Sequence, residues 1–197
     1  MPLFIAVKEG EAAAVETCIK RGDNVNPVDH QGNTPLHFAA TLGHSAIAKL
    51  LLEAGALVNT TDELGWTPLH KAAENGHTST LVVLIAADGK IDATDEECGT
   101  PLHYAAREGH NDTVSPLIVA GANPNSEDRQ GRTPLHHAVY SGHLSVTKAL
   151  IQMGANVDAQ AKDGNTALQE ATIEGHTALA TELIARGCNV NASNKYG

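Results

Sequence analysis

The sequence predicts an all-α solenoid, in which short helix-turn-helix units stack in a row. The first observation is a period, because the phrase TPLHFAATLGH at Thr34 recurs every 33 residues without insertions. The second is that each copy carries two short segments with helical apolar spacing, separated by glycine. The third is that one such unit has too little apolar surface to be stable alone, so neighbouring units must stack. The later copies are TPLHKAAENGH at Thr67, TPLHYAAREGH at Thr100, TPLHHAVYSGH at Thr133 and a looser TALQEATIEGH at Thr166.

The period divides residues 1–197 into six frames that we expect to form one domain. The frames are 1–33, 34–66, 67–99, 100–132, 133–165 and 166–197, of which the first and last are atypical. The chain opens and closes at the same phase of the repeat. We therefore expect a segment of a longer array, or a chain assembled to a repeat boundary.

The first helix of a frame is marked by its ends. Thr34 can cap a helix through its hydroxyl, and Pro35 loses no hydrogen bond at the first helical position. Leu36 and the two following alanines lie on one apolar face. Gly43 ends this helix.

The second helix is expected from about Ser45, with Ile47, Leu50 and Leu51 facing inward, and Gly55 ends it. The next segment, LVNTTDELGW, has Asn, Asp and Gly at turn positions and reads as an extended, hairpin-like finger loop.

Departures from the repeat predict weak points. Asp88 and Cys98 stand where other frames have glycine, so we expect the backbone to be adjusted there. Pro116 falls inside a predicted second helix, where a distortion is expected. The last copy has Ala167 for proline and Gln169 for histidine, and we expect weaker capping and bridging.

The phrase TPLHxAA…GH at this spacing, followed by LLLEAGALVN or ALIQMGANVD, resembles the ankyrin repeat over essentially the whole chain. The resemblance implies antiparallel helix pairs, fingers at roughly a right angle to them and a concave face. It also implies that the TPLH histidines bond to loop backbone and that the histidines after glycine bridge adjacent repeats. Three asparagines resemble ankyrin asparagines that an iron- and oxoglutarate-dependent enzyme hydroxylates, although an ordinary turn role is the simpler interpretation: Asn59, Asn125 and Asn191.

Composition excludes several classes of function. The net charge of −10 argues against nucleic-acid binding, which requires a surplus of Lys and Arg. The longest apolar run, LVVLIAA, is too short for a membrane span, and MPLFIAVKEGE is not a signal peptide. The three cysteines are widely spaced, which indicates a reducing compartment. We expect an intracellular, cytoplasmic monomer, with the nucleus left open.

Catalytic or metal chemistry is not expected. Nine of the eleven histidines fall into two repeat columns, as residues that hold units together would. No nucleotide-binding, hydrolase or metalloprotease motif is present, and we expect no cofactor. Cys18 and Cys188 align with buried positions. The alternative from another class is an enzyme that uses the exposed Cys98 or the His136–His137 pair.

The remaining function is recognition of another protein through the concave face and the fingers. The residues expected to read the partner are those that vary within fixed columns. Trp66 is the strongest candidate, because it is the only tryptophan and aromatic residues are enriched at binding hot spots, although it could instead pack over a neighbouring finger. The other candidates are Thr41, Leu42, Glu63, Leu64, Glu74, Asn75, Tyr104, Arg107, Glu108, Arg129, Arg132 and Tyr140. The wider set adds His30, Gln31, Asn33, Phe38, Lys71, Glu96, Glu97, Gly99, Gln130, His137, Ser141, Lys162, Asn165, Glu170, Ile173 and Glu174.

Charge suggests the nature of the partner. Residues 67–99 carry two lysines against six acidic residues, a local charge of −4, which favours a basic partner segment or a merely solvated loop. The runner-up function keeps the fold but is an engineered or idealised ankyrin scaffold with no native partner. The irregular residues Asp88, Cys98 and Pro116 count against that alternative.

Overall fold

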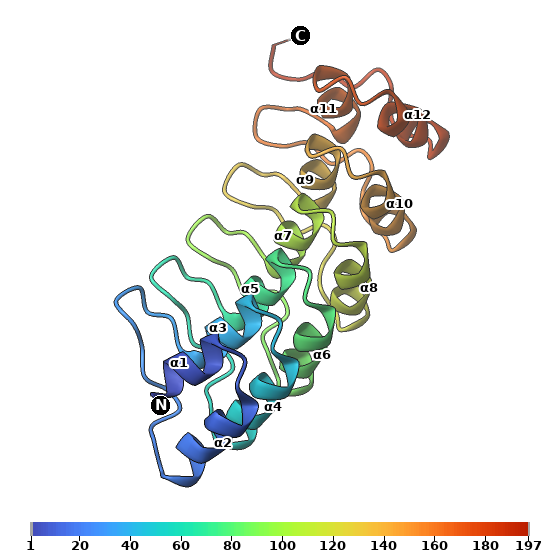
Figure 1. The fold of residues 1–197 in the computed structure, drawn as a ribbon. Coiled ribbons are helices and arrows are strands. Elements are labelled where there is room, and N and C mark those ends of the chain that lie inside the picture. Colours follow the sequence, from blue (N-terminus) through green and yellow to red (C-terminus); the bar gives the residue numbers. More distant parts are fainter. Residues whose placement is uncertain (1, 197) are drawn as a thin grey trace.

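The computed structural model describes residues 2–196, and within this range the chain is a row of six helix pairs (Figure 1). Its only β-bridge there joins Gln160 and Thr166, so the predicted all-α class is confirmed. The helices are α1 Leu3–Lys8, α2 Ala12–Lys20, α3 Pro35–Thr41, α4 Ser45–Glu53, α5 Pro68–Glu74, α6 Thr78–Ala86, α7 Pro101–Arg107, α8 Asn111–Val119, α9 Pro134–Tyr140, α10 Leu144–Gln152, α11 Ala167–Ile173 and α12 Thr177–Ala185.

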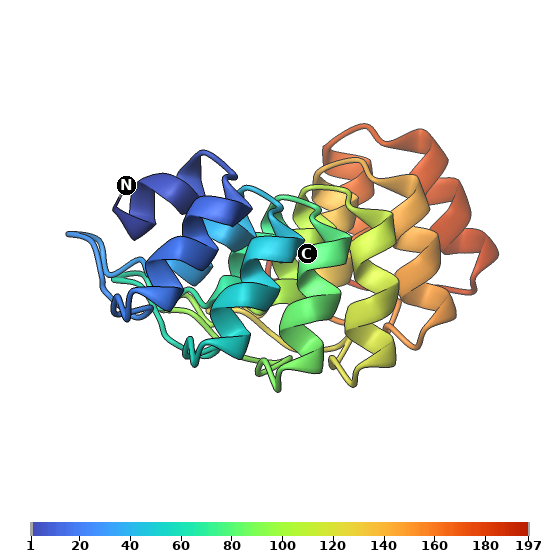
Figure 2. The same ribbon diagram turned by 60° about the horizontal axis from the view of Figure 1, so that its bottom comes forward.

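The helices form two layers. The odd-numbered helices pack on one another as an inner row, and the even-numbered helices pack behind them as an outer row. Figure 2 shows the pairs standing side by side from one end of the chain to the other. The finger loops all leave the same side of the inner row (Figure 1). We call the surface formed by the inner helices and the finger loops the concave face.

The inner helices from α3 to α11 start with the same cap, whereas α1 starts after Pro2 without a side-chain cap. The hydroxyl of Thr34 accepts from the His37 amide at 3.4 Å, and His37 Nδ1 accepts from the Thr34 amide at 3.1 Å. In α11 the prediction of weaker capping is wrong, because Gln169 reproduces the arrangement. Its Oε1 accepts from the Thr166 amide at 2.9 Å, and its Nε2 donates to the Ala192 carbonyl at 2.9 Å.

The core is continuous between the two layers. Leu36, Leu51 and their equivalents in the central frames are fully buried, whereas Leu168 of the last frame is partly buried. Cys18 and Cys188 are buried as predicted. Helix α8 runs from Asn111 to Val119 without a break at Pro116, so the expected distortion does not interrupt the helix.

Cys98 in its finger and Asp88 after helix α6 keep the left-handed backbone conformation of the glycines at the equivalent positions of other frames. Cys98 has φ 60° and Asp88 has φ 61°, in the left-handed region that glycine occupies elsewhere. The Cys98 amide donates to the Asp95 carbonyl at 3.1 Å, as the Gly65 amide does to Asp62 at 3.0 Å. The predicted backbone adjustment is therefore wrong. Cys98 and Asp88 adopt a left-handed conformation that is strained for a residue with a side chain.

Candidate functional site

The first four fingers are closed turns, each held by the carboxylate of its first residue. Asp62 Oδ1 accepts from the amides of Leu64 at 3.0 Å and Trp66 at 2.9 Å, and the Asp62 amide donates to the Trp66 carbonyl at 2.9 Å. The fingers that begin at Asp29, Asp95 and Asp128 are built in the same way. The fingers are therefore preformed loops with satisfied backbone groups.

Histidines join the fingers to the helices and the repeats to one another. His70 Nε2 lies 3.2 Å from the Gly99 carbonyl of the next finger, and His110 Nε2 lies 2.9 Å from the Glu74 carbonyl of the preceding repeat. Both roles that the resemblance implied for the histidines are thus present. Burial lowers the pKa of His37, His70, His103 and His136. Within residues 2–196, no group of three or more His, Cys, Asp or Glu side chains is arranged to hold a metal ion.

Trp66 is half-buried and packs against the following repeat. Its ring lies 4.3 Å from the Tyr104 ring, centroid to centroid, and Lys71 Nζ lies 4.6 Å above it. Lys71 also pairs with Asp62 at 2.8 Å. The side chain thus packs on residues of helices α5 and α7 rather than over a neighbouring finger, which was the alternative interpretation.

Tyr104 was expected to extend an apolar surface patch, but its side chain is only 9% exposed. Its hydroxyl donates to the Asp95 carboxylate, and burial together with this carboxylate raises the pKa of Tyr104. Four further positions that were expected at the surface are also buried: Gly99, and the side-chain-bearing Asn33, Asn165 and Glu170. Their side chains support the fingers or lie beneath them.

The charged candidates of the central repeats are largely paired with one another. Arg107 lies 3.2 Å from Glu74 and 2.8 Å from Glu108. Arg129 pairs with Glu97 at 3.0 Å, and burial raises the pKa of Glu74. The acidic segment therefore has fewer free carboxylates than the local charge of −4 indicates. Arg132 extends toward Glu170 at 3.5 Å, and its guanidinium also lies 5.6 Å from the Tyr140 ring centroid.

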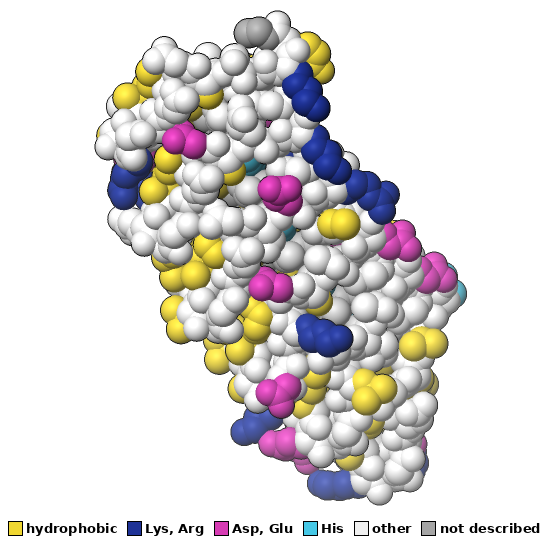
Figure 3. Space-filling model, turned by 180° about the vertical axis from the view of Figure 1, so that it is seen from behind, with side chains coloured by type: hydrophobic (Ala, Val, Ile, Leu, Met, Phe, Trp, Pro, Cys, Tyr) yellow, Lys and Arg dark blue, Asp and Glu magenta, His cyan; other side chains and the backbone are white. Residues whose placement is uncertain are grey.

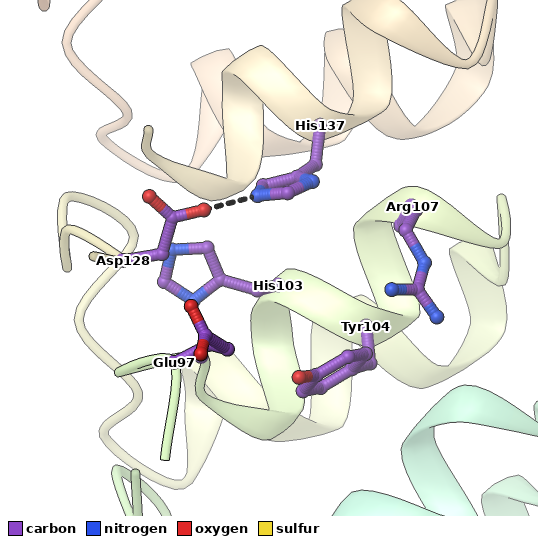
Figure 4. Close-up of a pocket in the computed structure, with 7 residues that line it drawn as sticks. Glu97, His103, Tyr104, Arg107, Asp128 and His137 are labelled. Atoms are coloured by element: carbon purple, nitrogen blue, oxygen red, sulfur yellow. Dashed lines mark hydrogen bonds and ion pairs between the residues drawn. The ribbon is translucent and has the colours of Figure 1, made fainter. Parts of the chain in front are cut away.

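A pocket opens on the concave face between α7 and α9 (Figure 4). His137 and Asp128 point toward each other at 2.8 Å, and the rings of His103 and His137 are 5.5 Å apart. Burial and the neighbouring imidazole lower the pKa of His103 to about 4. Sequence reasoning placed His137 near the groove but missed its bond to Asp128. The pocket is lined by Glu97, Gly99, His103, Tyr104, Arg107, Asp128 and His137.

This pocket contains an oriented Asp–His pair but no nucleophile beside it. Its lining includes no serine, threonine, cysteine or lysine, and the Tyr104 hydroxyl is engaged by Asp95. His136 is 1% exposed and bonds to Thr133 and to the Asn165 carbonyl. The lining of this pocket therefore offers charged and polar groups without a serine–histidine or cysteine–histidine pair.

Apolar side chains stand free at other points of the concave face. Leu42 is 42% exposed, Leu64 59%, Tyr140 49% and Ile173 65%. Among the remaining candidates, Glu63 and Asn75 are exposed, whereas Thr41 is half-buried and its hydroxyl donates to the His37 carbonyl at 3.0 Å.

The asparagines that resemble hydroxylation sites connect neighbouring repeats. The Asn59 amide group donates to the Asp88 carbonyl at 3.1 Å and accepts from the Lys90 amide at 2.7 Å. Asn125 makes the equivalent pair with Gly154 and Asn156. Asn191 is exposed. These bonds favour the ordinary structural role for the first two.

Comparison with known proteins agrees with this geometry. No helix within residues 2–196 is long and apolar enough to cross a lipid bilayer. A search of curated proteins finds no match. A family model described as ankyrin repeats in three copies matches residues 1–62, 58–128 and 102–194. Proteins built from these repeats generally act in protein–protein interaction and are typically not catalytic. The chain belongs to the ankyrin repeat family.

Proposed function

We propose that the chain binds a partner protein through its concave face and finger loops, without catalysis. The observation that carries the proposal is the exposure of Tyr140 and Ile173, which occupy the same position in consecutive repeats. The framework does not require an apolar residue at this position, since the other four frames have Lys8, Thr41, Glu74 and Arg107 there. Adjacent exposed apolar side chains are typical of binding surfaces.

The polar candidates complete this surface. Arg107, Glu108 and Glu74 form a charged centre, with Leu42 and Leu64 on its N-terminal side and Tyr140 on its C-terminal side. A partner segment that crosses several repeats would meet apolar, charged and again apolar contacts in that order. Paired charges at the centre give specificity more than affinity.

The test is capture of binding proteins from a cell extract, quantified by mass spectrometry. The variant Tyr140→Ser/Ile173→Ser should retain a genuine partner at least about tenfold less, since loss of a hot spot costs more than about 1 kcal/mol. The matched control is Val119→Ser on α8, which changes an 82% exposed apolar residue in the outer row. Circular dichroism establishes that all three proteins are folded. Equal capture by the wild type and the double variant, or equal loss in the control, would contradict the proposal.

A further inference from the structure

The exposed residues at one finger position form a row in which the sign of the charge changes once. We call these residues the fingertip row: His30, Glu63, Glu96, Arg129, Lys162 and Lys195. They are spaced 33 residues apart and are all exposed. From the N-terminal end, the row is neutral, then acidic twice, then basic three times. Figure 3 shows basic side chains gathered along one edge toward the C-terminal end, with acidic side chains further along the same edge.

Main-chain hydrogen bonds hold this row at fixed spacing. The Glu63 amide donates to the Gln31 carbonyl of the preceding finger at 3.0 Å, and the Glu96 amide donates to the Leu64 carbonyl at 3.2 Å. The equivalent bonds continue through the amides of residues 129, 162 and 195, at 2.7, 2.9 and 3.0 Å. Because packed helices are roughly 8–10 Å apart, successive fingertips share about that spacing. The backbone of the fingers therefore holds these charged residues at fixed positions relative to one another before a partner binds.

Four of these charges are available to a partner. Glu63, Glu96, Lys162 and Lys195 form no ion pair with another residue of the described range 2–196. The Lys162 ammonium donates only to the Arg129 carbonyl, at 2.7 Å. Arg129 differs from the other bases, because it pairs with Glu97 at 3.0 Å.

We infer that the fingertip row binds an extended segment of a partner protein that has two basic residues at one end and two acidic residues at the other. The inference rests on the proposed function and specifies the charge order of the partner. An extended chain in the polyproline II conformation rises about 3.1 Å per residue with three residues per turn, so every third residue lies on the same side and faces a new fingertip. Charges at positions 1, 4, 10 and 13 of the segment then meet Glu63, Glu96, Lys162 and Lys195. Position 7 faces the paired Arg129 and can be neutral.

The probe is a pair of end-blocked peptides with identical composition. In KSSKSSSSSESSE the charges are in two blocks, and in KSSESSSSSKSSE they alternate. The block peptide has one direction in which all four contacts are favourable. The alternating peptide has two favourable and two unfavourable contacts in either direction. At low salt, exposed pairs of this kind predict about tenfold tighter binding of the block peptide.

The measurement is a titration followed by the backbone amide resonances of the full chain in NMR. Wild type should prefer the block peptide, with the largest shifts at residues 63, 96, 162 and 195, and both affinities should fall as salt is added. The variant E96K/K162E keeps the composition and net charge but makes the row alternate, so its preference should reverse. E63K/K195E makes the same change at the ends of the row and serves as an independent second variant. An unchanged amide pattern elsewhere shows that each variant is folded.

Equal affinity of wild type for both peptides, or a preference that does not reverse in the variants, overturns the inference. Shifts confined to the inner helices around Tyr140 and Ile173 also overturn it but leave the proposed function standing. The proposed function fails separately, if Tyr140→Ser/Ile173→Ser leaves capture of the partner unchanged.

Discussion

Replacing the buried His103 by glutamine should make the chain less sensitive to acid. His103 is 2% exposed and is held neutral between the Thr100 cap and the Arg132 carbonyl. Burial and His137 lower its pKa from 6.5 to about 4. As the pH falls, the unfolded chain therefore takes up a proton before the folded chain does. The stabilisation that depends on neutral His103 is complete above pH 6.5 and is lost between pH 6.5 and 4.

The magnitude follows from these two values. With one pKa unit equal to about 1.4 kcal/mol, linkage predicts that His103 alone costs about 2 kcal/mol of unfolding free energy between pH 7.5 and 5. The other cap histidines, His37, His70 and His136, also have lowered pKa values, so the wild type loses more than this. His103→Gln removes the contribution of one histidine. Between pH 7.5 and 5 the variant should therefore lose about 2 kcal/mol less unfolding free energy than the wild type.

Gln169 supplies the reason to expect that the variant folds. At the same position of α11, its Oε1 makes the cap contact with the Thr166 amide and its Nε2 donates to a carbonyl of the following loop, that of Ala192, each at 2.9 Å. At pH 7.5 the cost of His103→Gln should therefore stay below about 1 kcal/mol, the scale of one exchanged hydrogen bond.

Equilibrium urea unfolding at pH 7.5 and 5, followed by circular dichroism, measures both effects. The control is His30→Gln, which changes an exposed fingertip histidine and should follow the wild type. If His103→Gln loses as much free energy as the wild type on acidification, the buried imidazole is not the acid-sensitive group and the reasoning is refuted.

Two further changes test the fingers by urea unfolding. Cys98→Gly should raise the unfolding free energy by about 1 kcal/mol, because it relieves a left-handed backbone at φ 60°, and no gain would show that this residue is not strained. Tyr104→Phe should lower the unfolding free energy by about 2 kcal/mol, since the Asp95 carboxylate loses a buried donor. The exposed Tyr140→Phe is its control and should change nothing measurable, so equal effects of the two substitutions would remove the buried bond as the cause.

Much of the framework can be predicted from the sequence because residues close in sequence determine where each helix begins and ends. Threonine and proline start the inner helix at Pro35, and the left-handed Gly43, with φ 73°, separates it from the outer helix that begins at Ser45, as predicted. The apolar spacing identifies the core, since Leu36 and Leu51 are fully buried. These devices act within a few residues, so the 33-residue period repeats them faithfully.

The burial of several candidate site residues was not predicted, because it depends on a contact between two columns nine residues apart. Asp62 pairs with Lys71, and Asp95 and Asp128 accept from Tyr104 and His137. When their repeat position is considered alone, Lys71, Tyr104 and His137 look like surface residues that vary freely. Their chemistry shares one property, which is a donor directed at the carboxylate of the finger.

The finger that begins at Ala161 supports this explanation by its exception. Ala161 replaces the opening aspartate, and Glu170 stands where the three preceding frames have the donors Lys71, Tyr104 and His137. The Glu170 carboxylate is buried and one of its oxygens has no hydrogen-bond donor, although Arg132 lies 3.5 Å away. Burial raises its pKa accordingly. When the aspartate at one repeat position is lost, the donor nine residues later is lost as well. This paired change is the sequence feature that could have revealed the contact.

The same contacts explain why the fingertips can carry any charge. The backbone hydrogen bonds within the fingers and between neighbouring fingers form without using the side chain at the tip. Glu96 and Lys162 thus occupy equivalent backbone positions although their charges are opposite. Because the fold is indifferent to the sign at these positions, the order of charges along the row is free to match the charges of the partner segment that we propose.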